Sequence, residues 1–587
     1  MSYFDWIVLI ISLLGIILYG VYKSRSSRNL EGYFLSDREM PWWLILLSIM
    51  GTQASAITFL SAPGQAYTDG MRFVQYYFGL PLAMVVLCIT FVPLFHRLRL
   101  YTAYEYLEKR FDVKTRIITS FLFLLQRGVS TGISVYAPSI ILSSLLGWNI
   151  YITNVLMGGL LIIYTMSGGA KAVAYTQQLQ LIIIFVSMFV AAYMVVRLLP
   201  EGVGFFDALK VGGKMGKLNV ITTGMKPNGG FDWSDQYNLL SGLIGGLFLA
   251  LSYFGTDQSQ VGRYLTAKSL RESRVGLLMN GLVKVPMQFL ILLIGVLVFS
   301  FYQFHKAPLF FNNTLVEKVA NSTYADSLKI IQSEYDQFNN RKLALMEKYP
   351  RVESGMDFSP VFQEELKNVN RQGDSLRKSF KQMIGKSGVG GDSNDTNYIF
   401  LRFVIDFLPK GLVGLLIAVI FLASWGSIAA ALNSLASASV VDFHKKFVNP
   451  SMTESQDYRI AKIYTLLWGI FCIVVAMFAY NIGNSLIEAV NKLGSLFYGV
   501  VLGVFLVAFF FKKIRGNAVF WSAILGELGV ITLFVLNEKK IIGLGFLWLN
   551  FIGAVAVIAI AWILQLLISR NGNSTVSIQD VSGIPQK

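Results

Sequence analysis

Charged residues are scarce in this chain. They make up 14% of its 587 residues, whereas 54% are hydrophobic, and the mean hydropathy is +0.56. Soluble globular domains carry about 25% charged residues. A composition this apolar argues against a water-soluble enzyme and indicates a protein that spans a membrane.

Cysteine and histidine are also rare, with two and three residues in the whole chain. Cys88 and Cys472 each lie inside an apolar run, which excludes a disulfide scaffold and a cysteine-based metal site. The chain also lacks the HExxH motif and the nucleophile elbow. It has no P-loop either, because the triplet at 385–387 has Phe380 in place of the upstream glycine. The sequence therefore predicts that the protein is not an enzyme.

Acidic residues are outnumbered by basic ones: 34 Asp and Glu stand against 50 Lys and Arg, for a formal net charge of +16. The basic residues lie in short clusters between long apolar runs and not on one patch, which is the pattern of the positive-inside rule. Nucleic acid is therefore not expected as a partner. The expected partners are the lipid bilayer and a small-molecule solute, with no obligate protein partner.

Long apolar stretches recur through nearly the whole chain. Thirteen of them are long enough to cross about 30 Å of hydrocarbon. An odd number of spans places the two termini on opposite sides of the membrane. The stretches lie near residues 4–22, 42–60, 73–95, 117–145, 150–166, 177–197, 238–256, 275–302, 410–441, 460–480, 484–510, 518–536 and 541–569.

The basic clusters predict the orientation of these spans. The first apolar run follows Asp5 and precedes Lys23 and Arg25, without a small-residue cleavage site, so we expect a retained helix with its N-terminus outside. The C-terminus is then inside. The compact loops favour a bacterial inner membrane. The later clusters assigned to the inside are Arg97, Arg99, Lys109, Arg110, Lys114, Arg116, Arg263, Lys268, Arg271, Arg274, Lys445, Lys446, Lys512, Lys513 and Arg515.

One long segment, residues 303–400, departs from the apolar pattern. Within it, Leu328, Ile331, Tyr335 and Phe338 repeat at helical spacing, which predicts an amphipathic helix or hairpin on the outer face. The predicted organisation is an N-terminal helix and inside loop (1–30), a first five-helix repeat (31–200), an outside loop (201–237), the start of a second repeat (238–302), the polar outside loop (303–400), the rest of the second repeat (401–515), two C-terminal helices (516–570) and an inside tail (571–587).

Two spans carry small and polar residues that a plain membrane helix avoids. The first is residues 50–58, closed by Pro63, and the second runs from Gly242 through Gly246 to Asp257. Unwound backbone in mid-membrane is tolerated where it lines a cavity, and its free carbonyls can hold a cation. The breaks fall at matching positions in two five-helix units, 42–197 and 238–510. The alternative is that small residues only permit close helix packing.

A third feature lies in the ninth span, where Ser424, Ser427 and Ser434 recur among small residues at helical spacing. They place an oxygen-bearing stripe on one helix face that another helix can approach closely. Oxygen ligands without thiols, imidazoles or a carboxylate pair suit a hard monovalent cation better than a transition metal.

At these residues the chain resembles the sodium:solute symporter family, which includes sodium/glucose, iodide, proline, multivitamin and sialic acid carriers. The resemblance covers about residues 30 to 515. It implies an all-α multi-pass membrane protein of about thirteen transmembrane helices with an inverted five-plus-five helix repeat, the LeuT-like fold. The motifs that carry it are Gly32-Tyr33-Phe34-Leu35, Met40-Pro41-Trp42-Trp43, residues 102–111, Tyr136-Ala137-Pro138, residues 167–173, Thr256-Asp257-Gln258, residues 263–268 and Asn433 to Asp442.

The resemblance implies a sodium site between the second and ninth spans. It consists of the carbonyl oxygens of Gly51, Ala54 and Ala423 and hydroxyls from two adjacent residues, which are Gly426 and Ser427 here. Gly426 has no hydroxyl, so water or Ser424 is expected to complete the shell, and the sequence leaves sodium or protons open as the coupling ion. A second sodium site of some members uses an aspartate and further hydroxyls, where this chain has Gln177, Ala429 and Ala430. One coupling Na+ is therefore predicted.

The substrate positions implied by the resemblance match less closely. Tyr253 corresponds to an inner-gate tyrosine and Lys284 to a lysine that contacts sugar, while Glu488 stands where sugar carriers have glutamine. Ala250 and Thr58 replace the asparagine and histidine typical of sugar sites, so a hexose is not favoured.

Arg127 is a charge in the middle of an apolar span, which by default indicates a functional site. With Thr58 and Gln75 it resembles the carboxylate-binding arrangement of sialic acid carriers. The alternative is an ion pair with Glu488 or another internal acid, and Glu488 is equally suited to contact a substrate hydroxyl or amine.

The predicted function is sodium-coupled symport by alternating access. One Na+ joins the second span to the ninth and orders the adjacent substrate pocket, so ion and solute strengthen each other's binding by the same factor. A carboxylated sugar such as sialic acid is the predicted solute; a neutral polyol, a sugar or a monocarboxylate is the alternative. A channel or a transporter-like sensor is a further alternative, distinguished because a carrier saturates and accumulates its solute.

Overall fold

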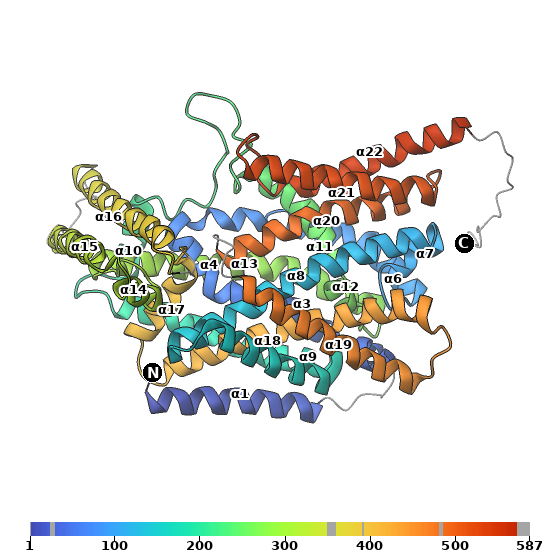
Figure 1. Ribbon diagram of the computed structural model, residues 1–587, viewed down its shortest axis with the longest axis horizontal. Coiled ribbons are helices and arrows are strands. Elements are labelled where there is room, and N and C mark those ends of the chain that lie inside the picture. The colour runs from blue at the N-terminus through green and yellow to red at the C-terminus, as the bar shows by residue number, and fades with distance from the viewer. Residues whose placement is uncertain (1, 24–29, 349–359, 390–392, 480–484, 572–587) are drawn as a thin grey trace.

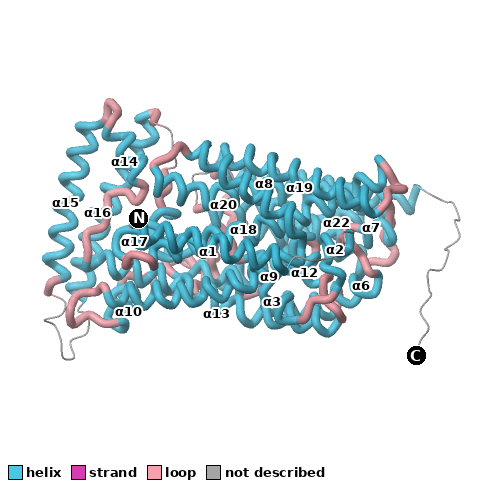
Figure 2. Tube along the Cα trace, turned by 90° about the horizontal axis from the view of Figure 1, so that it is seen from below, coloured by secondary structure: helices cyan, strands magenta, loops and turns pink. Residues whose placement is uncertain are grey.

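The computed structural model describes residues 2–23, 30–348, 360–389, 393–479 and 485–571. Within these residues it is all-helical, without strands (Figure 2). The helices are α1 (Tyr3–Lys23), α2 (Leu30–Leu35), α3 (Trp42–Gln53), α4 (Ala56–Asp69), α5 (Leu80–Ile89), α6 (Phe91–Leu98), α7 (Glu105–Arg110), α8 (Val113–Leu146), α9 (Ile150–Arg197), α10 (Phe205–Lys214), α11 (Gly246–Gly255), α12 (Gln258–Tyr264), α13 (Leu270–Phe304), α14 (Asn313–Ala320), α15 (Ala325–Met346), α16 (Pro360–Ser387), α17 (Thr396–Phe407), α18 (Leu412–Ala438), α19 (Glu454–Phe478), α20 (Leu486–Phe510), α21 (Gly516–Glu538) and α22 (Trp548–Asn571), with short turns η1 (Ser36–Arg38), η2 (Met71–Tyr77), η3 (Ser241–Gly245) and η5 (Ser439–Val448).

The long helices lie side by side in one bundle (Figure 1). Ten of them, among the described residues, are long and apolar enough to cross a membrane, or eleven if α3 and α4 count as one bent span. Two shorter apolar helices, Ile150–Met166 and Ser241–Gly255, coincide with the remaining predicted spans. Each of the thirteen predicted stretches therefore falls on a helix, although the number that cross the bilayer stays a prediction.

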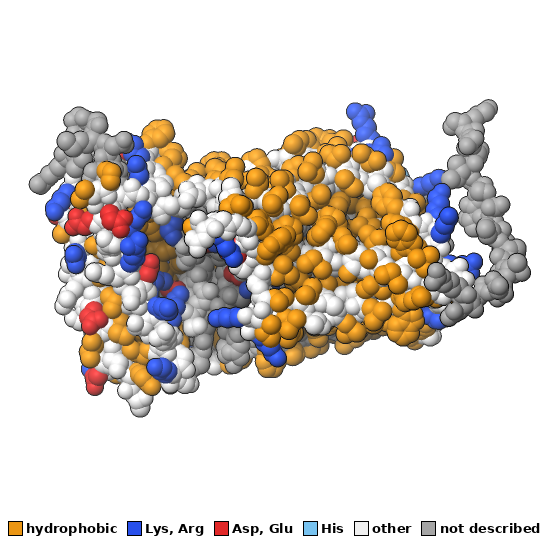
Figure 3. Space-filling model, turned by 90° about the horizontal axis from the view of Figure 1, so that it is seen from above, with side chains coloured by type: hydrophobic (Ala, Val, Ile, Leu, Met, Phe, Trp, Pro, Cys, Tyr) orange, Lys and Arg blue, Asp and Glu red, His pale blue; other side chains and the backbone are white. Residues whose placement is uncertain are grey.

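The surface of the bundle is apolar along its middle. Figure 3 shows hydrophobic side chains over the central part of one face and Lys and Arg near the two ends. Large apolar side chains such as Ile163 and Phe189 are 68% and 60% exposed. Water-soluble proteins bury such side chains, whereas a bilayer solvates them. The prediction of a multi-pass membrane protein is confirmed.

The core of the bundle is α18, whose residues are nearly all buried. It packs against α1, α8 and α9. Helix α9 joins two predicted spans across a kink at Gly169, where φ is +58°. A Cβ at this position would lie 3.0 Å from the ring and carbonyl of Tyr33, so both the conformation and the close approach require glycine.

The first predicted break is confirmed. Helices α3 and α4 meet at Ala54 and Ser55 with a bend of 60°. In the second predicted break, the glycines from 242 to 246 remain helical and form the π-turn η3. The chain leaves the helix further on, at Thr256 and Asp257, where α11 ends and α12 begins.

The polar segment forms a helical insert at one end of the bundle, and its position outside the membrane stays a prediction. Figure 2 shows α15 and α16 standing across that end, transverse to the long helices. Leu328, Tyr335 and Phe338 are buried and Ile331 is partly buried. The N-terminus of α1 lies at the same end, and α22 ends at the opposite one (Figure 1).

Candidate functional site

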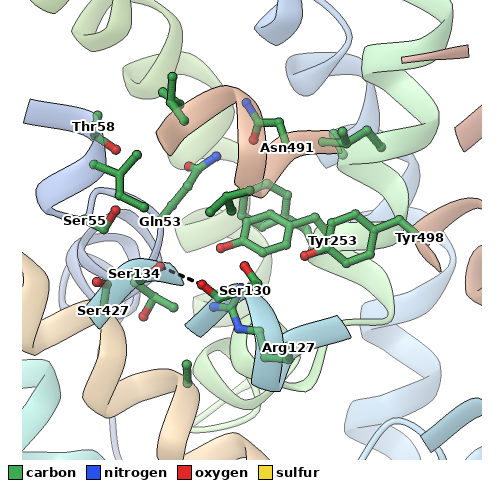
Figure 4. Close-up of a pocket in the computed structure, with 18 of the residues that line it drawn as sticks. Gln53, Ser55, Thr58, Arg127, Ser130, Ser134, Tyr253, Ser427, Asn491 and Tyr498 are labelled. Atoms are coloured by element: carbon green, nitrogen blue, oxygen red, sulfur yellow. Dashed lines mark hydrogen bonds between the residues drawn. The ribbon is translucent and has the colours of Figure 1, made fainter. Parts of the chain in front are cut away.

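A cavity lies at the break between α3 and α4. Its walls come from that break and from η2, α8, α11, α18 and α20. Four residues predicted from the sequence line it: Thr58, Arg127, Tyr253 and Ser427. Figure 4 shows Gln53, Ser55 and Thr58 on one side of the space, Tyr253 and Tyr498 on another, and Arg127 with Ser130 and Ser134 below. The fold thus brings together groups that are up to 446 positions apart in sequence, from Thr52 to Tyr498.

Arg127 is buried in α8 and remains incompletely paired. Its Nη1 lies 3.7 Å from the Oδ2 of Asp257, which is an ion pair and too long for a hydrogen bond. Its guanidinium carbon lies 5.7 Å from the ring centre of Tyr253, and its Nε has no hydrogen-bond partner. A buried guanidinium that keeps free donors beside a cavity is suited to bind a carboxylate.

Asp257 is the internal acid beside Arg127, so the expected alternative partner Glu488 is not the one observed. Asp257 caps α12 by accepting from the Ser259 amide and hydroxyl, at 2.8 and 2.6 Å. It also accepts from the hydroxyl of Tyr498 at 3.0 Å. The carboxylate is therefore fully engaged by short hydrogen bonds, and Arg127 is its weakest contact. The sequence showed Asp257 only as part of a motif, without this role.

The three other predicted substrate residues lie outside the cavity lining. Gln75 donates to the Thr222 hydroxyl at 2.9 Å and the Tyr237 carbonyl at 3.0 Å, so its amide anchors the 201–237 loop to η2. Glu488 pairs with Lys492 on α20 at 3.0 Å. Each of these two side chains thus has a partner within the protein.

Lys284 is fully buried on α13, and its Nζ has no hydrogen-bond acceptor. It lies 5.6 Å from the ring centre of Tyr77, a residue that lines the cavity. Lys284 therefore contacts a residue of the cavity wall without lining the cavity itself.

Several cavity residues were not predicted. Asn491 accepts from the Tyr76 hydroxyl at 3.1 Å, and its own Nδ2 has no partner. The Oε1 of Gln53 is likewise buried without a partner. Asn491 follows Glu488 by three residues, so one turn of α20 separates the predicted position from the one that lines the cavity. The lining also includes Ser130, Ser134 and Tyr498.

The predicted sodium positions meet around one side chain of α9, Gln177. Its Nε2 donates to the carbonyl of Gly426 at 3.0 Å and to the Thr52 hydroxyl at 3.3 Å, and its Oε1 accepts from Ser48 at 2.9 Å. A Cβ on Gly51 would lie 2.9 Å from the Gln177 side chain. The last turn of α3 and the middle of α18 are therefore adjacent, as the predicted site requires.

The break in α3 frees backbone oxygen at this place. The Ala54 amide donates to Met50, and the Ser55 amide donates to Gln53 at 3.2 Å, not to Gly51. Helix ends leave such carbonyls for other partners. On α18, the Ser427 hydroxyl donates to the carbonyl of Ser424 at 3.0 Å, and Ala423 is buried one turn before it. These are the oxygen atoms that a hard cation needs.

Gly426 adjoins a second glutamine. A Cβ built there would lie only 2.5 Å from the Oε1 of Gln180 on α9. Gln180 is 3% exposed. An amide oxygen therefore occupies the space that a hydroxyl-bearing side chain at position 426 would need. This contact was not predictable from the sequence, because Gln180 lies on another helix.

Known proteins are similar to this chain over most of its length. A sodium/sialic acid symporter of Aliivibrio fischeri is 25% identical, over 99% of this chain and 97% of its own length. Another from Proteus mirabilis is also 25% identical, over 95% and 94%, and a sodium-dependent multivitamin transporter of Oryctolagus cuniculus is 25% identical over 87% and 67%.

A solved structure of a Na+-coupled sialic acid symporter, in a substrate-bound outward-open state, superposes with a TM-score of 0.72 at 22% identity. It covers 96% of this chain and 98% of that one. This match confirms the predicted fold. The sodium:solute symporter family matches residues 33–326 and 380–526, which are most of the chain. The chain therefore belongs to the sodium:solute symporter family, as predicted, and is a sodium-coupled transporter of small solutes and not an enzyme.

Proposed function

We propose that this symporter carries a carboxylated sugar, such as a sialic acid, and that Arg127 binds the carboxylate. The observation that carries the proposal is the incomplete pairing of Arg127, whose nearest carboxylate is 3.7 Å away and whose Nε is free. A substrate carboxylate at the cavity would complete these hydrogen bonds. Relatives named as sodium/sialic acid symporters support the choice of solute.

The rest of the cavity suits a polyhydroxylated ring. Hydroxyls of Thr58, Ser130 and Ser134 and the free amide of Asn491 offer hydrogen bonds, and Tyr253 and Tyr498 offer apolar faces. Small-molecule sites combine apolar walls with a few such polar groups. Gln75, Lys284 and Glu488 act from outside this site, as supports of its walls.

For the coupling ion, we place one Na+ between the end of α3 and α18. Its ligands are the carbonyls of Gly51, Ala54 and Ala423, the hydroxyl of Ser427 and the Oε1 of Gln180, which replaces the hydroxyl that Gly426 lacks. Bound there, Na+ ties the broken helix to α18. Because Ser427 also lines the cavity, occupation by Na+ favours the solute-binding arrangement, and the solute favours Na+ equally.

Na+ and solute enter from the end that carries the insert, which we assign to the outside of a bacterial inner membrane, with the N-terminus outside and the C-terminus inside. Alternating access then exposes the cavity to the other end.

The test is uptake of radiolabelled sialic acid into proteoliposomes with and without an inward Na+ gradient. Wild type should accumulate the solute only with Na+. Arg127→Ala should lose about 10- to 100-fold in kcat/KM, because a charge-assisted hydrogen bond contributes about 1.5–3 kcal/mol. Ser134→Ala, which removes another polar group from the same helix and cavity, is the matched control and should lose far less.

Absence of Na+-driven uptake by wild type would exclude this solute. A panel of inositols, hexoses and monocarboxylates then distinguishes the alternatives, since Arg127 would still select carboxylates over neutral sugars. Solute flux without accumulation against a gradient would indicate a channel.

A further inference from the structure

The insert encloses a second cavity at the end of the bundle. The family match stops at residue 326 and resumes at 380, so most of α15 and α16 lies outside it. The two helices pack against each other, with Gly373 of α16 facing the ring of Phe338 on α15. The cavity lies between this pair and the end of α4, and we call it the vestibule.

The vestibule is strongly basic. Seven Lys or Arg side chains line it, and Asp374 is the one carboxylate among the described lining residues. Arg377 and Lys381 share the single carboxylate of Asp395, at 2.6 and 3.2 Å. Lys367 and Lys378 form no ion pair with any described residue, so positive charge remains uncompensated at the cavity. Such a concave basic surface attracts anions.

Aromatic side chains supply its other walls. Tyr67, Phe299, Tyr335 and Phe338 all line the vestibule. The Nζ of Lys217 lies 5.0 Å from the ring centre of Phe299, so charge and apolar surface are adjacent. This combination suits an anion with an apolar face, such as a sugar ring with a carboxylate, better than a bare inorganic ion.

One helix, α4, contributes residues to both the vestibule and the central cavity. Thr58 of α4 lines the central cavity, and Tyr67 of the same helix lines the vestibule nine residues later. At 1.5 Å per residue the two positions are about 14 Å apart. The Nζ of Lys217 donates to the carbonyl of Thr68 at 2.5 Å, so a side chain that lines the vestibule is hydrogen-bonded to the last turn of α4.

We propose that the vestibule is a second binding site for a carboxylated sugar, which captures the solute at the outer face before it passes along α4 to Arg127. The choice of solute rests on the proposed function, whereas the site itself rests on the insert. Unpaired Lys367 and Lys378 bind the carboxylate, and the aromatic walls hold the ring.

The test measures equilibrium binding of radiolabelled sialic acid to the purified full chain in Na+. In the Arg127→Ala background, which weakens the central site about 10- to 100-fold, tight binding should persist. Adding Lys367→Glu and Lys378→Glu should weaken this residual binding at least 10-fold. Adding Lys329→Glu and Lys386→Glu, the same charge change on exposed residues of the insert outside the vestibule, should leave it unchanged.

Loss of all binding in Arg127→Ala, or residual binding that survives Lys367→Glu and Lys378→Glu, overturns the vestibule site. Uptake by the otherwise wild-type chain separates this result from a failure of the proposed function. If the chain takes up no sialic acid but the Arg127→Ala variant binds it through the two lysines, the proposed function fails and the vestibule stands. If uptake is normal and the Lys367→Glu and Lys378→Glu changes affect residual binding no more than Lys329→Glu and Lys386→Glu do, the proposal of a vestibule site fails and the proposed function stands.

Discussion

In the proposed sodium site, the Oε1 of Gln180 replaces the side-chain oxygen that Gly426 lacks. The hydroxyl expected beside Ser427 is absent, and an amide oxygen from α9 takes its space, 2.5 Å from where a Cβ would lie. Neither residue alone indicates a cation ligand. Their combination preserves an oxygen at this position while the backbone carbonyl of Gly426 bonds to Gln177.

The proposed role of Gln180 predicts how Gly426→Ser changes the Na+ dependence of uptake. The new side chain collides with Gln180, so the Na+ concentration for half-maximal uptake should rise about 10-fold, equivalent to ~1.4 kcal/mol. Gln180→Ala alone should raise it similarly, because it removes the ligand. The double variant, which frees the space and supplies a hydroxyl, should recover most of the affinity. An unaltered Na+ dependence in Gln180→Ala would show that its oxygen is not a ligand. The measurement is the Na+ dependence of initial uptake.

Among the elements, a buried network of hydrogen bonds links α8 to η5 at the end of α18. Asp442 is fully buried and accepts from Arg116 at 2.6 Å, from the Thr102 hydroxyl at 2.8 Å and from the Ser120 hydroxyl at 2.8 Å. Arg116 also pairs with Glu108 at 2.6 Å. The motif that begins at Thr102 and the motif that ends at Asp442 are separate in the sequence but contact each other in the fold. Their contact holds α7 and α8 against α18.

Removing this carboxylate should destabilise the bundle. Asp442→Ala leaves the buried Arg116 without its main counter-charge, which costs about 3–5 kcal/mol. Asp442→Asn keeps one acceptor oxygen, for either Thr102 or Ser120, and should cost less. The thermal midpoint of the purified protein in detergent measures both. A thermal midpoint of Asp442→Ala equal to that of the wild type would contradict the stabilising role of this network. The control is Asp406→Ala, which breaks a more exposed ion pair with Arg402.

At the scale of the whole molecule, Asp395 is one of the residues that attach the insert to the bundle. This residue precedes α17, is buried, and accepts from Arg377 of α16 and from the Phe311 amide at 3.0 Å. Burial opposes ionisation of Asp395, but the charges of Arg377 and Lys381 and the Phe311 amide outweigh it and lower its pKa below the usual 3.8. The attachment therefore depends on an ionised carboxylate.

A carboxyl group whose pKa is lowered by folding contributes stability that is complete above its pKa in the unfolded chain. This contribution is lost as the pH falls through its pKa in the folded protein. The insert should be docked at pH 7 and loosen below about pH 4. Hydrogen exchange of residues 360–387 measures this. Asp395→Asn should raise exchange at pH 7 and remove its acid dependence. Exchange in wild type that is equally slow, after correction for intrinsic rates, at pH 7 and pH 3 would contradict the ion-pair anchor.

The membrane architecture was predictable because it depends on local properties. A span needs about 20 apolar residues in succession, whatever its neighbours are, so hydropathy located each stretch. The bend at Ala54 followed in the same way, since small and polar residues in mid-membrane favour a break. The motifs then placed the chain in its family.

The composition of the sites was decided by the tertiary structure. Whether Arg127 meets Glu488 or Asp257, and whether Glu488 or Asn491 faces the cavity, depends on the rotation of helices about their axes, which packing against distant helices determines. The same holds for Gln180 beside Gly426 and for the basic vestibule, whose walls come from α4, α13, α15 and α16. Hydropathy determined by itself where the chain crosses the membrane, because burial in lipid acts on each segment separately. Only the fold decided which side chains meet, because those contacts join segments far apart in the sequence.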